Sequence, residues 1–383
     1  MARLDEIFDL QMGKTPSRNN ADYWIDGQYD WVSIADLGTY QKYVDETKEK
    51  ISALAVQESG IKSVPANTVI MSFKLSLGKT AITQEPIYTN EAIMAFIPTR
   101  KYEVLPDYFY HLFSAKDWTK GTNRAVMGTT LNKATLGSFS ITVPSLTEQR
   151  KIAAVLDKVS GLIAKRRQQL DKLDEMVKAR FVEMFGDPVE NPYGFRKVAL
   201  SELAEIKIGP FGSLLHKEDY IEGGHPLLNP SHIVDGKVAP DSKLTISDKK
   251  YDELEAYHLH TGDVVMGRRG EMGRCAVVPS EGFLCGTGSL LIRTKGEVTA
   301  DYIQKIISFP SFRKMIEDMA VGQTMPNLNV PIVSKFQIIK PPIEVQKNYY
   351  KFVEQTDKSK LALQKSLDKL ETLKKALMQK YFG

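Results

Sequence analysis

The sequence predicts an α+β protein in which two tandem mixed α/β domains are separated and followed by long helices that pair as an antiparallel coiled coil. Three observations lead to this prediction. A helical stretch occurs twice without a gap, at residues 144–186 and 341–383, its apolar residues have coiled-coil spacing, and the segments before each copy also align weakly. The chain therefore has an internal pseudo-twofold repeat.

Each copy of the helical stretch is expected to form one long helix. Neither copy contains a proline after its first few residues, and the copies end in Gly186 and Gly383. A helix from Thr147 to Met184 would be about 57 Å long, more than an ordinary core helix needs. A duplicated amphipathic helix with ordinary packing is the simpler alternative. Surface helices change length freely unless length is constrained, so the equal lengths favour an antiparallel pair that acts as a spacer.

The apolar seam of this spacer follows alternating steps of three and four residues. It consists of Ile152, Leu156, Val159, Ile163, Leu170 and Leu173 in the first copy and Val353, Leu363, Leu367, Leu370 and Leu377 in the second. Polar residues at seam positions, Arg166, Lys360 and Lys374, are expected to fix the register of the pair.

The globular segments before the two helices carry the same order of motifs. Residues 67–82 align with residues 262–277, and each stretch is expected to form a β-hairpin with a basic, glycine-containing loop. A further strand follows at residues 90–99 and 285–294, and then a short amphipathic helix.

The chain is expected to divide at the ends of the repeated helices. A stretch rich in Pro, Gly and Asn, residues 185–194, marks the end of the first helix. We expect domains at residues 1–143 and 187–340, with spacer helices at residues 144–186 and 341–383.

Composition favours a protein that is cytoplasmic and has no membrane partner. The start of the chain lacks the apolar core of a signal peptide, and no apolar run approaches the roughly 20 residues of a membrane span. Only Cys275 and Cys285 occur, without zinc-ligand spacing, so neither a metal site nor a disulfide framework is expected. The net charge of +4 permits a polyanionic partner without requiring one.

The sequence contains no specific catalytic motif, so no catalytic residues are expected. Gly13-Lys14-Thr15 resembles the end of a phosphate loop, but Phe8 stands where that motif needs its first glycine. No strand–GxGxxG–helix unit is present. Asn191-Pro192-Tyr193 is similar to a methyltransferase box but lacks its second proline and is interpreted as a turn.

Basic and polar residues in loops are the remaining functional candidates, because such side chains contact phosphates and base edges. The candidates for DNA binding are Lys14, Ser17, Arg18, Asn19, Ser72, Lys74, Lys79, Asn123, Arg124 and Thr129 in the first globular segment and Ser213, Lys217, Arg268, Arg269, Arg274, Gln323 and Asn327 in the second. Arg268-Arg269 is the strongest pair, since the flanking Gly267 and Gly270 let a backbone approach a ligand closely. The alternative for each residue is ordinary polar surface.

Several soft motifs occur in the duplicated order and span the full length. They are Pro144 with Gln149, Pro341 with Gln346, Phe185-Gly186-Asp187-Pro188 followed by Asn191-Pro192, Gly13-Lys14-Thr15-Pro16-Ser17, and residues 31–37. With these motifs the whole chain resembles the DNA-specificity subunit of type I restriction-modification systems.

The resemblance implies two target-recognition domains, each reading one half of a bipartite, asymmetric sequence in double-stranded DNA. It also implies that the chain is non-catalytic and binds no cofactor itself. Two methyltransferase subunits would dock on it and methylate adenine at N6 with S-adenosylmethionine, and restriction/translocase subunits that use ATP and Mg²⁺ would join them.

Two other classes of function remain open from the residues alone. The first is a non-catalytic coiled-coil scaffold or interaction protein without sequence-specific DNA binding. The second is a complete enzyme whose site has diverged beyond recognition. Sequence-dependent DNA binding separates the specificity subunit from the scaffold, and an assay of the isolated chain for methyl transfer or ATP hydrolysis would reveal the enzyme.

Overall fold

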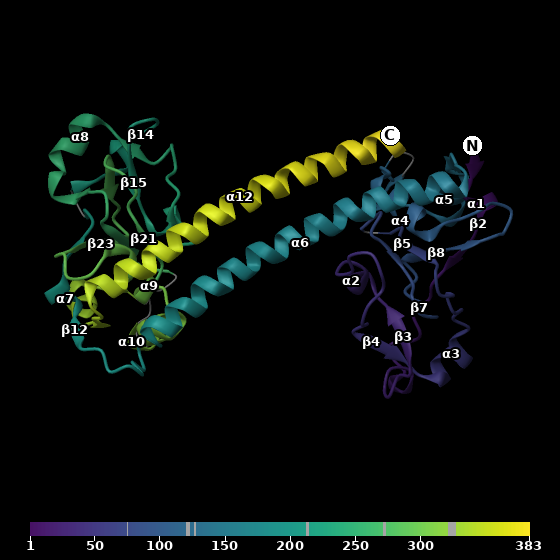
Figure 1. Ribbon diagram of the computed structural model, residues 1–383, viewed down its shortest axis with the longest axis horizontal. Coiled ribbons are helices and arrows are strands. Elements are labelled where there is room, and N and C mark those ends of the chain that lie inside the picture. The colour runs from purple at the N-terminus through teal and green to yellow at the C-terminus, as the bar shows by residue number, and fades with distance from the viewer. Residues whose placement is uncertain (75, 120–122, 126–127, 212–213, 271–272, 321–326) are drawn as a thin grey trace. The chain divides into compact units, whose positions relative to one another are not determined.

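The computed structural model describes residues 1–74, 76–119, 123–125, 128–211, 214–270, 273–320 and 327–383 (Figure 1). The chain forms two compact units. Unit 1 contains residues 1–169 and 363–383, and unit 2 contains residues 170–362. Both unit boundaries lie inside the long helices α6 (Leu146–Phe185) and α12 (Ile343–Phe382), so each unit contains part of both helices.

Unit 1 is built on a four-stranded antiparallel sheet with the order β2-β8-β5-β6. Its strands are β2 (Phe8–Met12), β8 (Ile93–Pro98), β5 (Val69–Ser72) and β6 (Thr80–Ile82). A three-stranded sheet contains β4 (Glu49–Ile51), β3 (Tyr29–Val32) and β7 (Tyr88–Thr89), with β3 and β7 parallel. Two short antiparallel pairs join β1 (Ala2–Arg3) to β11 (Ser140–Ile141) and β9 (Asn123–Ala125) to β10 (Gly128–Thr130).

An aromatic core holds the helices of unit 1 on this sheet. The helices are α1 (Leu4–Ile7), the 3₁₀ turn η1 (Ala21–Tyr23), α2 (Ile34–Leu37), α3 (Ala53–Ser59), α4 (Pro106–Ala115) and α5 (Lys133–Ser138). Phe109 of α4 packs edge-on against Phe8 of β2, with 5.0 Å between the ring centroids. The ring centroids of Phe113 of α4 and Phe96 of β8 are 4.5 Å apart. Figure 1 shows α4 beside β5 and β8. Burial of these rings fixes the helix on the sheet.

Unit 2 has a four-stranded antiparallel sheet with the order β13-β23-β20-β21. Its strands are β13 (Ala204–Ile208), β23 (Ser289–Thr294), β20 (Val264–Gly267) and β21 (Cys275–Val277). A five-stranded sheet contains β14 (Tyr220–Ile221), β18 (Thr245–Ile246), β15 (His225–Leu228), β22 (Phe283–Cys285) and β19 (His258–Leu259), with β15 and β22 parallel. Short antiparallel pairs join β12 (Lys197–Ala199) to β24 (Gln337–Ile339) and β16 (Ile233–Val234) to β17 (Lys237–Val238).

The described helices of unit 2 follow the same order, with η5 and α10 as additions. They are α7 (Leu200–Leu203), η3 (Lys217–Asp219), η4 (Pro230–His232), α8 (Asp248–Glu253), η5 (Glu255–Tyr257), α9 (Ala300–Ile307), α10 (Pro310–Ala320) and α11 (Val330–Ser334). Helix α10 follows α9, whereas in unit 1 only residues 116–122 separate α4 from β9.

The predicted fold class and internal repeat are confirmed by this duplicated topology. The β-hairpins predicted at residues 67–82 and 262–277 are β5-β6 and β20-β21. The strands predicted after them are β8 and β23, each lying between the first strand of its sheet and the hairpin.

Both long helices form as predicted from the absence of proline. The helix expected from Thr147 to Met184 runs from Leu146 to Phe185, and each long helix has 40 residues. The first helix ends at Gly186, whose φ of +70° favours glycine. All predicted seam positions are shielded from solvent: Ile152, Leu156, Val159, Ile163 and Leu367 are buried, and Leu170, Leu173, Val353, Leu363, Leu370 and Leu377 are half-buried.

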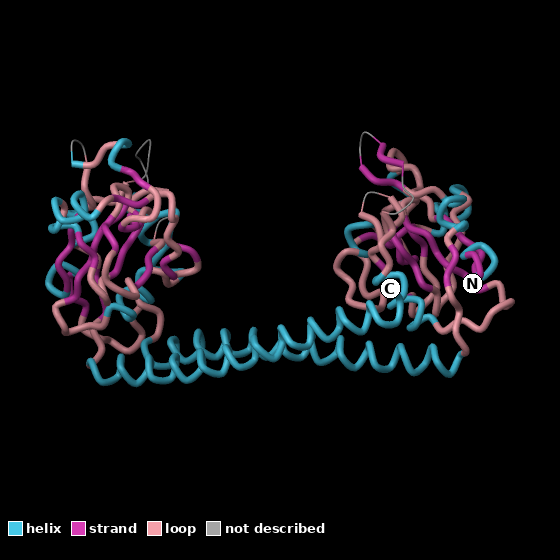
Figure 2. Tube along the Cα trace, turned by 90° about the horizontal axis from the view of Figure 1, so that it is seen from above, coloured by secondary structure: helices cyan, strands magenta, loops and turns pink. Residues whose placement is uncertain are grey.

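The helices pair in antiparallel fashion within each unit (Figure 2). In unit 1, Arg167 near the middle of α6 donates to Glu371 in the last half of α12 at 2.7 Å. In unit 2, Lys360 in the first half of α12 forms an ion pair with Asp174 in the last half of α6. The polar seam residue Lys360 also pairs with Asp357 of its own helix, and Arg166 donates to Gln169 of its own helix at 2.7 Å.

Gln149 ties the start of α6 to unit 1. Its side chain is fully buried. Its Oε1 accepts from the backbone N–H of Leu105 at 2.9 Å, and its Nε2 donates to the carbonyls of Glu103 and Pro144 at 2.8 and 2.9 Å. One amide thus satisfies backbone groups at the starts of both α4 and α6.

Gln346 occupies the equivalent position in unit 2 and is also fully buried. Its Oε1 accepts from the backbone N–H of Thr299 at 3.0 Å, and its Nε2 donates to the carbonyl of Pro341 at 3.0 Å. The Pro and Gln motifs of the sequence are therefore helix-start clamps in both units.

The segment after α6 is a turn, as predicted for Asn191-Pro192-Tyr193. Asn191 has a φ of +54°, and its side chain bonds both the carbonyl and the N–H of Phe195, at 2.7 and 2.9 Å. The Tyr193 hydroxyl donates to the carbonyl of Glu183 at 3.0 Å. These side chains are engaged with backbone, which is the role of a turn.

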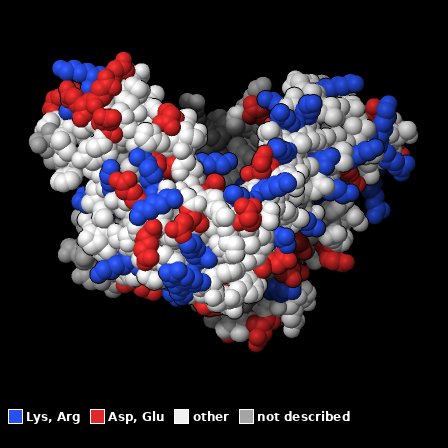
Figure 3. Space-filling model, turned by 60° about the vertical axis from the view of Figure 1, so that its left-hand side comes forward, with Lys and Arg blue, Asp and Glu red and all other residues white. Residues whose placement is uncertain are grey.

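Charged side chains of both signs are spread over the surface. On the face drawn in Figure 3, Lys and Arg alternate with Asp and Glu, in keeping with the net charge of +4. None of the described helices has an apolar stretch long enough to cross a bilayer.

Candidate nucleic-acid interface

The basic hairpin loop occupies the same place in both units. The β5-β6 loop of unit 1 is joined to the segment after β10 by a backbone hydrogen bond from Leu131 N–H to the Phe73 carbonyl, at 3.0 Å. The β20-β21 loop of unit 2 has the matching bond from Leu328 N–H to the Arg268 carbonyl, at 2.9 Å. At one end of each sheet, two separate segments that carry candidate residues therefore meet.

In unit 2 this meeting joins two of the candidates, Arg268 and Asn327. Arg268 follows β20 directly, and its N–H donates to the Gly288 carbonyl at 3.0 Å. Its Nε donates to Oδ1 of Asn327 at 3.1 Å. Burial lowers the pKa of the half-buried Arg268 guanidinium, and the adjacent charge of Arg269 lowers it further. Arg269 itself is exposed.

The other described basic candidates of unit 2 are Arg274 and Lys217. Arg274 closes the β20-β21 loop, and its Nη1 donates to the carbonyl of Pro230 in η4 at 3.3 Å. Lys217 is exposed as the first residue of η3. Arg274 therefore braces the loop.

Arg18 of unit 1 is already bound within its own unit. Its Cζ lies 3.6 Å from the ring centroid of Trp24 and 5.1 Å from that of Trp31. Its Nη2 donates to Oε2 of Glu49 at 2.9 Å, and this hydrogen-bonded carboxylate raises the pKa of Arg18. A DNA phosphate or base would have to replace Glu49 as its partner.

The neighbouring candidates Lys14, Ser17 and Asn19 are exposed in the segment after β2. The Lys14 ammonium donates to the carbonyl of Ser59. The carbonyl of Ser17 accepts from Nε1 of Trp24 at 3.2 Å. The loop is therefore held by its tryptophan while its polar side chains face solvent.

The three candidates in and beside the β5-β6 loop differ in exposure: Ser72 is buried, whereas Lys74 and Lys79 reach the surface. Ser72 is fully buried, accepts from the backbone N–H of Lys79 at 3.1 Å and donates to the Ser76 carbonyl. Its hydroxyl shapes the loop from within, which corrects the expectation that Ser72 reaches DNA. Lys79 is exposed, and the half-buried Lys74 holds its Nζ 5.2 Å from the Phe73 ring.

For the remaining candidates the structure describes the backbone of some residues and none of the others. Asn123, Arg124 and Thr129 lie in the β9-β10 hairpin, where Arg124 pairs with Thr129, and the description extends to their backbone alone. Ser213 and Gln323 lie outside the described residues.

Sequence reasoning missed an ionic cluster that ties unit 1 to α6. Nζ of Lys42 lies 2.6 Å from Asp107 and 2.7 Å from Asp157, and Nε2 of His111 lies 2.8 Å from Asp157. Burial alone would raise the pKa of Asp157, but hydrogen bonds from His111 and Lys42 outweigh it and lower the pKa. Lys42 and Asp157 are far in sequence from each other and from Asp107 and His111 of α4, so only the fold reveals the cluster.

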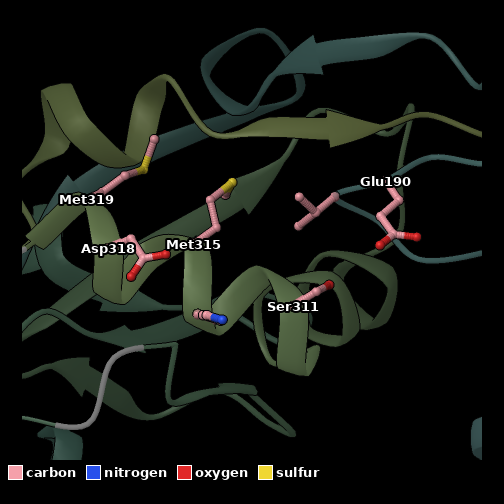
Figure 4. Close-up of a pocket in the computed structure, with 7 residues that line it drawn as sticks. Glu190, Ser311, Met315, Asp318 and Met319 are labelled. Atoms are coloured by element: carbon pink, nitrogen blue, oxygen red, sulfur yellow. The ribbon is translucent and has the colours of Figure 1, made fainter.

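Two hollows of the described surface lie away from the candidate residues. One, of about 510 Å³, lies beside α10, with Met315, Met319 and Asp318 on one side and Glu190 facing them (Figure 4). Another, of about 440 Å³, is lined by carboxylates such as Asp30 and other polar residues of unit 1. Neither of these two hollows is lined by a candidate residue.

Metal and thiol chemistry find no support in the described part of the chain. Within it, no group of three or more His, Cys, Asp or Glu side chains is arranged to hold a metal ion. Cys275 and Cys285 are free and buried, and burial raises the pKa of each thiol to about 12. Both side chains act as small apolar core residues.

The duplicated frame, whose polar loops differ between the two units, defines a protein with two tandem equivalent domains, and comparison with known proteins identifies its family. The sequence matches the type I restriction modification DNA specificity domain at residues 1–174 and again at 192–375. The chain belongs to this family of type I restriction-modification specificity subunits, which are the non-catalytic components of their complexes.

Relatives and solved structures agree with this assignment. The chain is 24% identical over 401 residues to the MjaIX specificity subunit of Methanocaldococcus jannaschii, covering 99% of this chain and 91% of the relative. It is 32% identical over 168 residues to the EcoR124I/EcoR124II specificity subunit of Escherichia coli, covering 42% of this chain and 40% of the relative.

Two solved structures share the fold. The S subunit from M. genitalium has a TM-score of 0.55 at 14% identity, covering 100% of this chain and 95% of the other. A chain from a study of complex assembly and conformational transition in the type I system has a TM-score of 0.66 at 18% identity, with 100% and 96% coverage.

Proposed function

We propose that this chain recognises a bipartite, asymmetric DNA sequence, with one target-recognition domain, residues 1–143, reading one half and the other, residues 187–340, reading the second. The observation that carries the proposal is the repeated sheet whose equivalent loops differ in chemistry. At the same backbone position unit 1 has Phe73 and unit 2 has Arg268. Because the two domains share a sheet but differ in their loops, they are expected to read different half-sites.

We assign the reading surface to candidates at the loop end of each sheet. In the first domain these are Lys14, Ser17, Arg18, Asn19, Lys74 and Lys79, with Asn123, Arg124 and Thr129 on the adjacent hairpin. In the second they are Lys217, Arg268, Arg269 and Arg274 with Asn327, joined by Ser213 and Gln323 from the sequence alone. Side chains of these types bond both phosphates and base edges.

The long helices, residues 144–186 and 341–383, serve as the spacer between the two domains. Each is an uninterrupted helix of 40 residues, and they pair in antiparallel fashion. Two readers joined by a stiff spacer bind together only when the gap between half-sites fits, and joint binding raises affinity strongly. Half-sites about one helical turn apart, roughly 34 Å, present to one face of the duplex.

The catalytic chemistry belongs to partner subunits. As a type I specificity subunit the chain assembles with two methyltransferase subunits and with restriction/translocase subunits. S-adenosylmethionine for adenine-N6 methylation and ATP with Mg²⁺ for translocation bind those partners. Exposed apolar residues of the helices outside the seam, such as Leu162, Met176, Leu361 and Leu373, offer a docking face. The modest charge of +4 indicates that partners also contribute phosphate contacts.

Mapping methylated adenines tests this proposal. The chain is assembled with its methyltransferase subunits, the complex modifies unmethylated genomic DNA, and N6-methyladenine is located by sequencing. The expected result is two different specific half-sequences separated by a non-specific gap of constant length. Methylation without a sequence rule, or none by an assembled complex, would contradict the proposal and favour a scaffold.

A further inference from the structure

Among the described residues, the half-buried side chain of Arg268 has no carboxylate partner, unlike the side chains of Arg293 and Arg180 in the same unit. Arg293 donates to Asp263 at 2.8 and 2.7 Å, and Arg180 pairs with Glu183 at 2.8 Å. Among the described residues, the side chain of Arg268 has a hydrogen bond to the neutral amide of Asn327 and no ion pair. A half-buried guanidinium beside a second arginine is electrostatically uncompensated. An incoming group rich in acceptors would compensate it.

The position of the Arg268 side chain is fixed before any ligand arrives. Its N–H and carbonyl are bonded to Gly288 and Leu328 at 3.0 and 2.9 Å, which anchors the backbone in two directions. Asn327 then accepts from Nε at 3.1 Å. With Nε occupied, the terminal Nη1 and Nη2 groups remain to donate, and they form a planar fork for two adjacent acceptors. Such preorganisation lowers the entropy cost of binding.

We propose that Arg268, held by Asn327, reads a guanine in the major groove of the half-site bound by the second domain. This inference rests on the proposed DNA-reading function and deepens it to one residue and one base. Guanine presents two adjacent acceptors, O6 and N7, to the groove. Adenine replaces the first acceptor with an amino donor, which would oppose the donors of Arg268. Asn327 is then a positioning residue and does not read a base itself.

The adjacent Arg269 supplies a matched control for the phosphate alternative. It is exposed and precedes Gly270, whose φ of +77° is a left-handed backbone conformation that favours glycine. Because Arg269 has no hydrogen-bond or ion-pair partner among the described residues, it suits contact with the phosphate backbone, which carries no sequence information. Arg268→Ala and Arg269→Ala therefore separate base reading from phosphate contact at neighbouring positions of one loop.

The experiment measures methylation rates and DNA affinity of the assembled complex on a set of sites that differ at single base pairs. Arg268→Ala is expected to reduce discrimination at one G·C pair by roughly 10- to 100-fold, leaving all other positions of both halves unchanged. Arg268→Lys loses the fork and should relax the same position. Asn327→Ala should weaken that preference in part, while Asn327→Asp retains an acceptor for Nε and should preserve it. Arg269→Ala should lower affinity for all sites alike and reduce the salt dependence by about one ion.

Three results would overturn the inference. A uniform loss of affinity in Arg268→Ala with unchanged base preference would make Arg268 a phosphate contact. Relaxation at two positions in Asn327→Ala would make Asn327 a base reader. Unchanged discrimination in Arg268→Ala would exclude Arg268 from recognition. Intact preference at the other positions of the same half-site shows that the second domain of a variant is folded. A wild-type complex without any sequence preference would instead contradict the proposed function itself.

Discussion

The two units place different charge chemistry on the same helix of the same frame. In unit 1, α4 contributes Asp107 and His111 to the cluster that also contains Lys42 and Asp157. Burial would lower the pKa of Lys42, but hydrogen bonds to the two aspartates outweigh burial and raise it. Every charged group in this cluster has an opposite partner, so unit 1 holds α6 through paired charges.

In unit 2 the aligned residues of α9 are Asp301 and Lys305, and burial dominates both. Burial raises the pKa of Asp301. Burial lowers the pKa of Lys305, and nearby Lys178 and Lys360 lower it further. The charged forms are therefore disfavoured where unit 1 stabilises them. Backbone hydrogen bonds and apolar burial therefore preserve the shared fold of the two units, while the polar residues on equivalent helices can differ.

The largest effect is expected from a change in the length of the helices α6 and α12, which both units share. Four residues inserted after Gln169 are expected to lengthen the permitted gap between half-sites and leave both half-sequences unchanged. Methylation of the original sequence should fall on the order of 100-fold or more, because the two domains no longer bind jointly. Mapping methylated adenines measures both effects. A matched insertion of four residues after Ser366, made together with the first, preserves helix pairing, and an unchanged gap in this double insertion would refute the spacer role.

The helix-start clamps differ in strength between the two units, because the Gln149 side chain makes three hydrogen bonds and the Gln346 side chain makes two. Gln149→Ala should destabilise unit 1 by about 3 kcal/mol, and Gln346→Ala should destabilise unit 2 by about 2 kcal/mol. Hydrogen exchange read separately for each unit measures the difference, since a chain with two units need not unfold in one step. Equal losses in both units from either variant would show that the clamps act on the whole chain.

Acid should act oppositely on the two units. The folded-state pKa of Asp157 lies below its unfolded value of 3.8, so its stabilisation is present above that pH and is lost as pH falls through the folded-state pKa. The pKa of Asp301 is raised above 3.8, so its ionisation destabilises unit 2, and falling pH relieves this. Asp157→Asn should remove ~1 kcal/mol from unit 1 at neutral pH, since partial exposure screens the pair. Hydrogen exchange at several pH values below 6 tests this, with Asp301→Asn as the matched control.

The smallest expected effect concerns the ion pair of Arg18 with Glu49. Both side chains are substantially exposed, so Glu49→Gln should change stability by no more than about 0.5 kcal/mol. The same substitution releases the guanidinium and should strengthen binding to the half-site of the first domain severalfold. Arg18→Ala should weaken only that half. Titration of single half-sites with the assembled complex checks both, and a loss of affinity in Glu49→Gln would mean that Glu49 holds Arg18 in its reading position.

The architecture could be predicted because it is encoded by repetition and periodicity. The gapless repeat and the absence of proline were enough to place both long helices to within a residue or two. The alignment of residues 67–82 with residues 262–277, each with a basic, glycine-containing loop, located the β5-β6 and β20-β21 hairpins. Local signals of this kind depend on neighbours in sequence, which a sequence displays directly.

The candidate interface was predictable only as a set of loops. Ser72 looked equivalent to the exposed residues, yet its hydroxyl closes the loop from inside. The partner of Arg18 is Glu49, and that of Arg268 is Asn327. These pairs are joined by the fold across long stretches of chain, so composition and spacing carry no trace of them.

The central claim is that two equal frames read different half-sites because their loops differ. The most direct test replaces residues 1–143 with a second copy of residues 187–340, joined at the aligned Pro144, and maps the adenines methylated by the assembled complex. The account predicts that the asymmetric target becomes an inverted repeat of the half-sequence read by the second domain. A folded, assembled variant that still methylates an asymmetric sequence would contradict it.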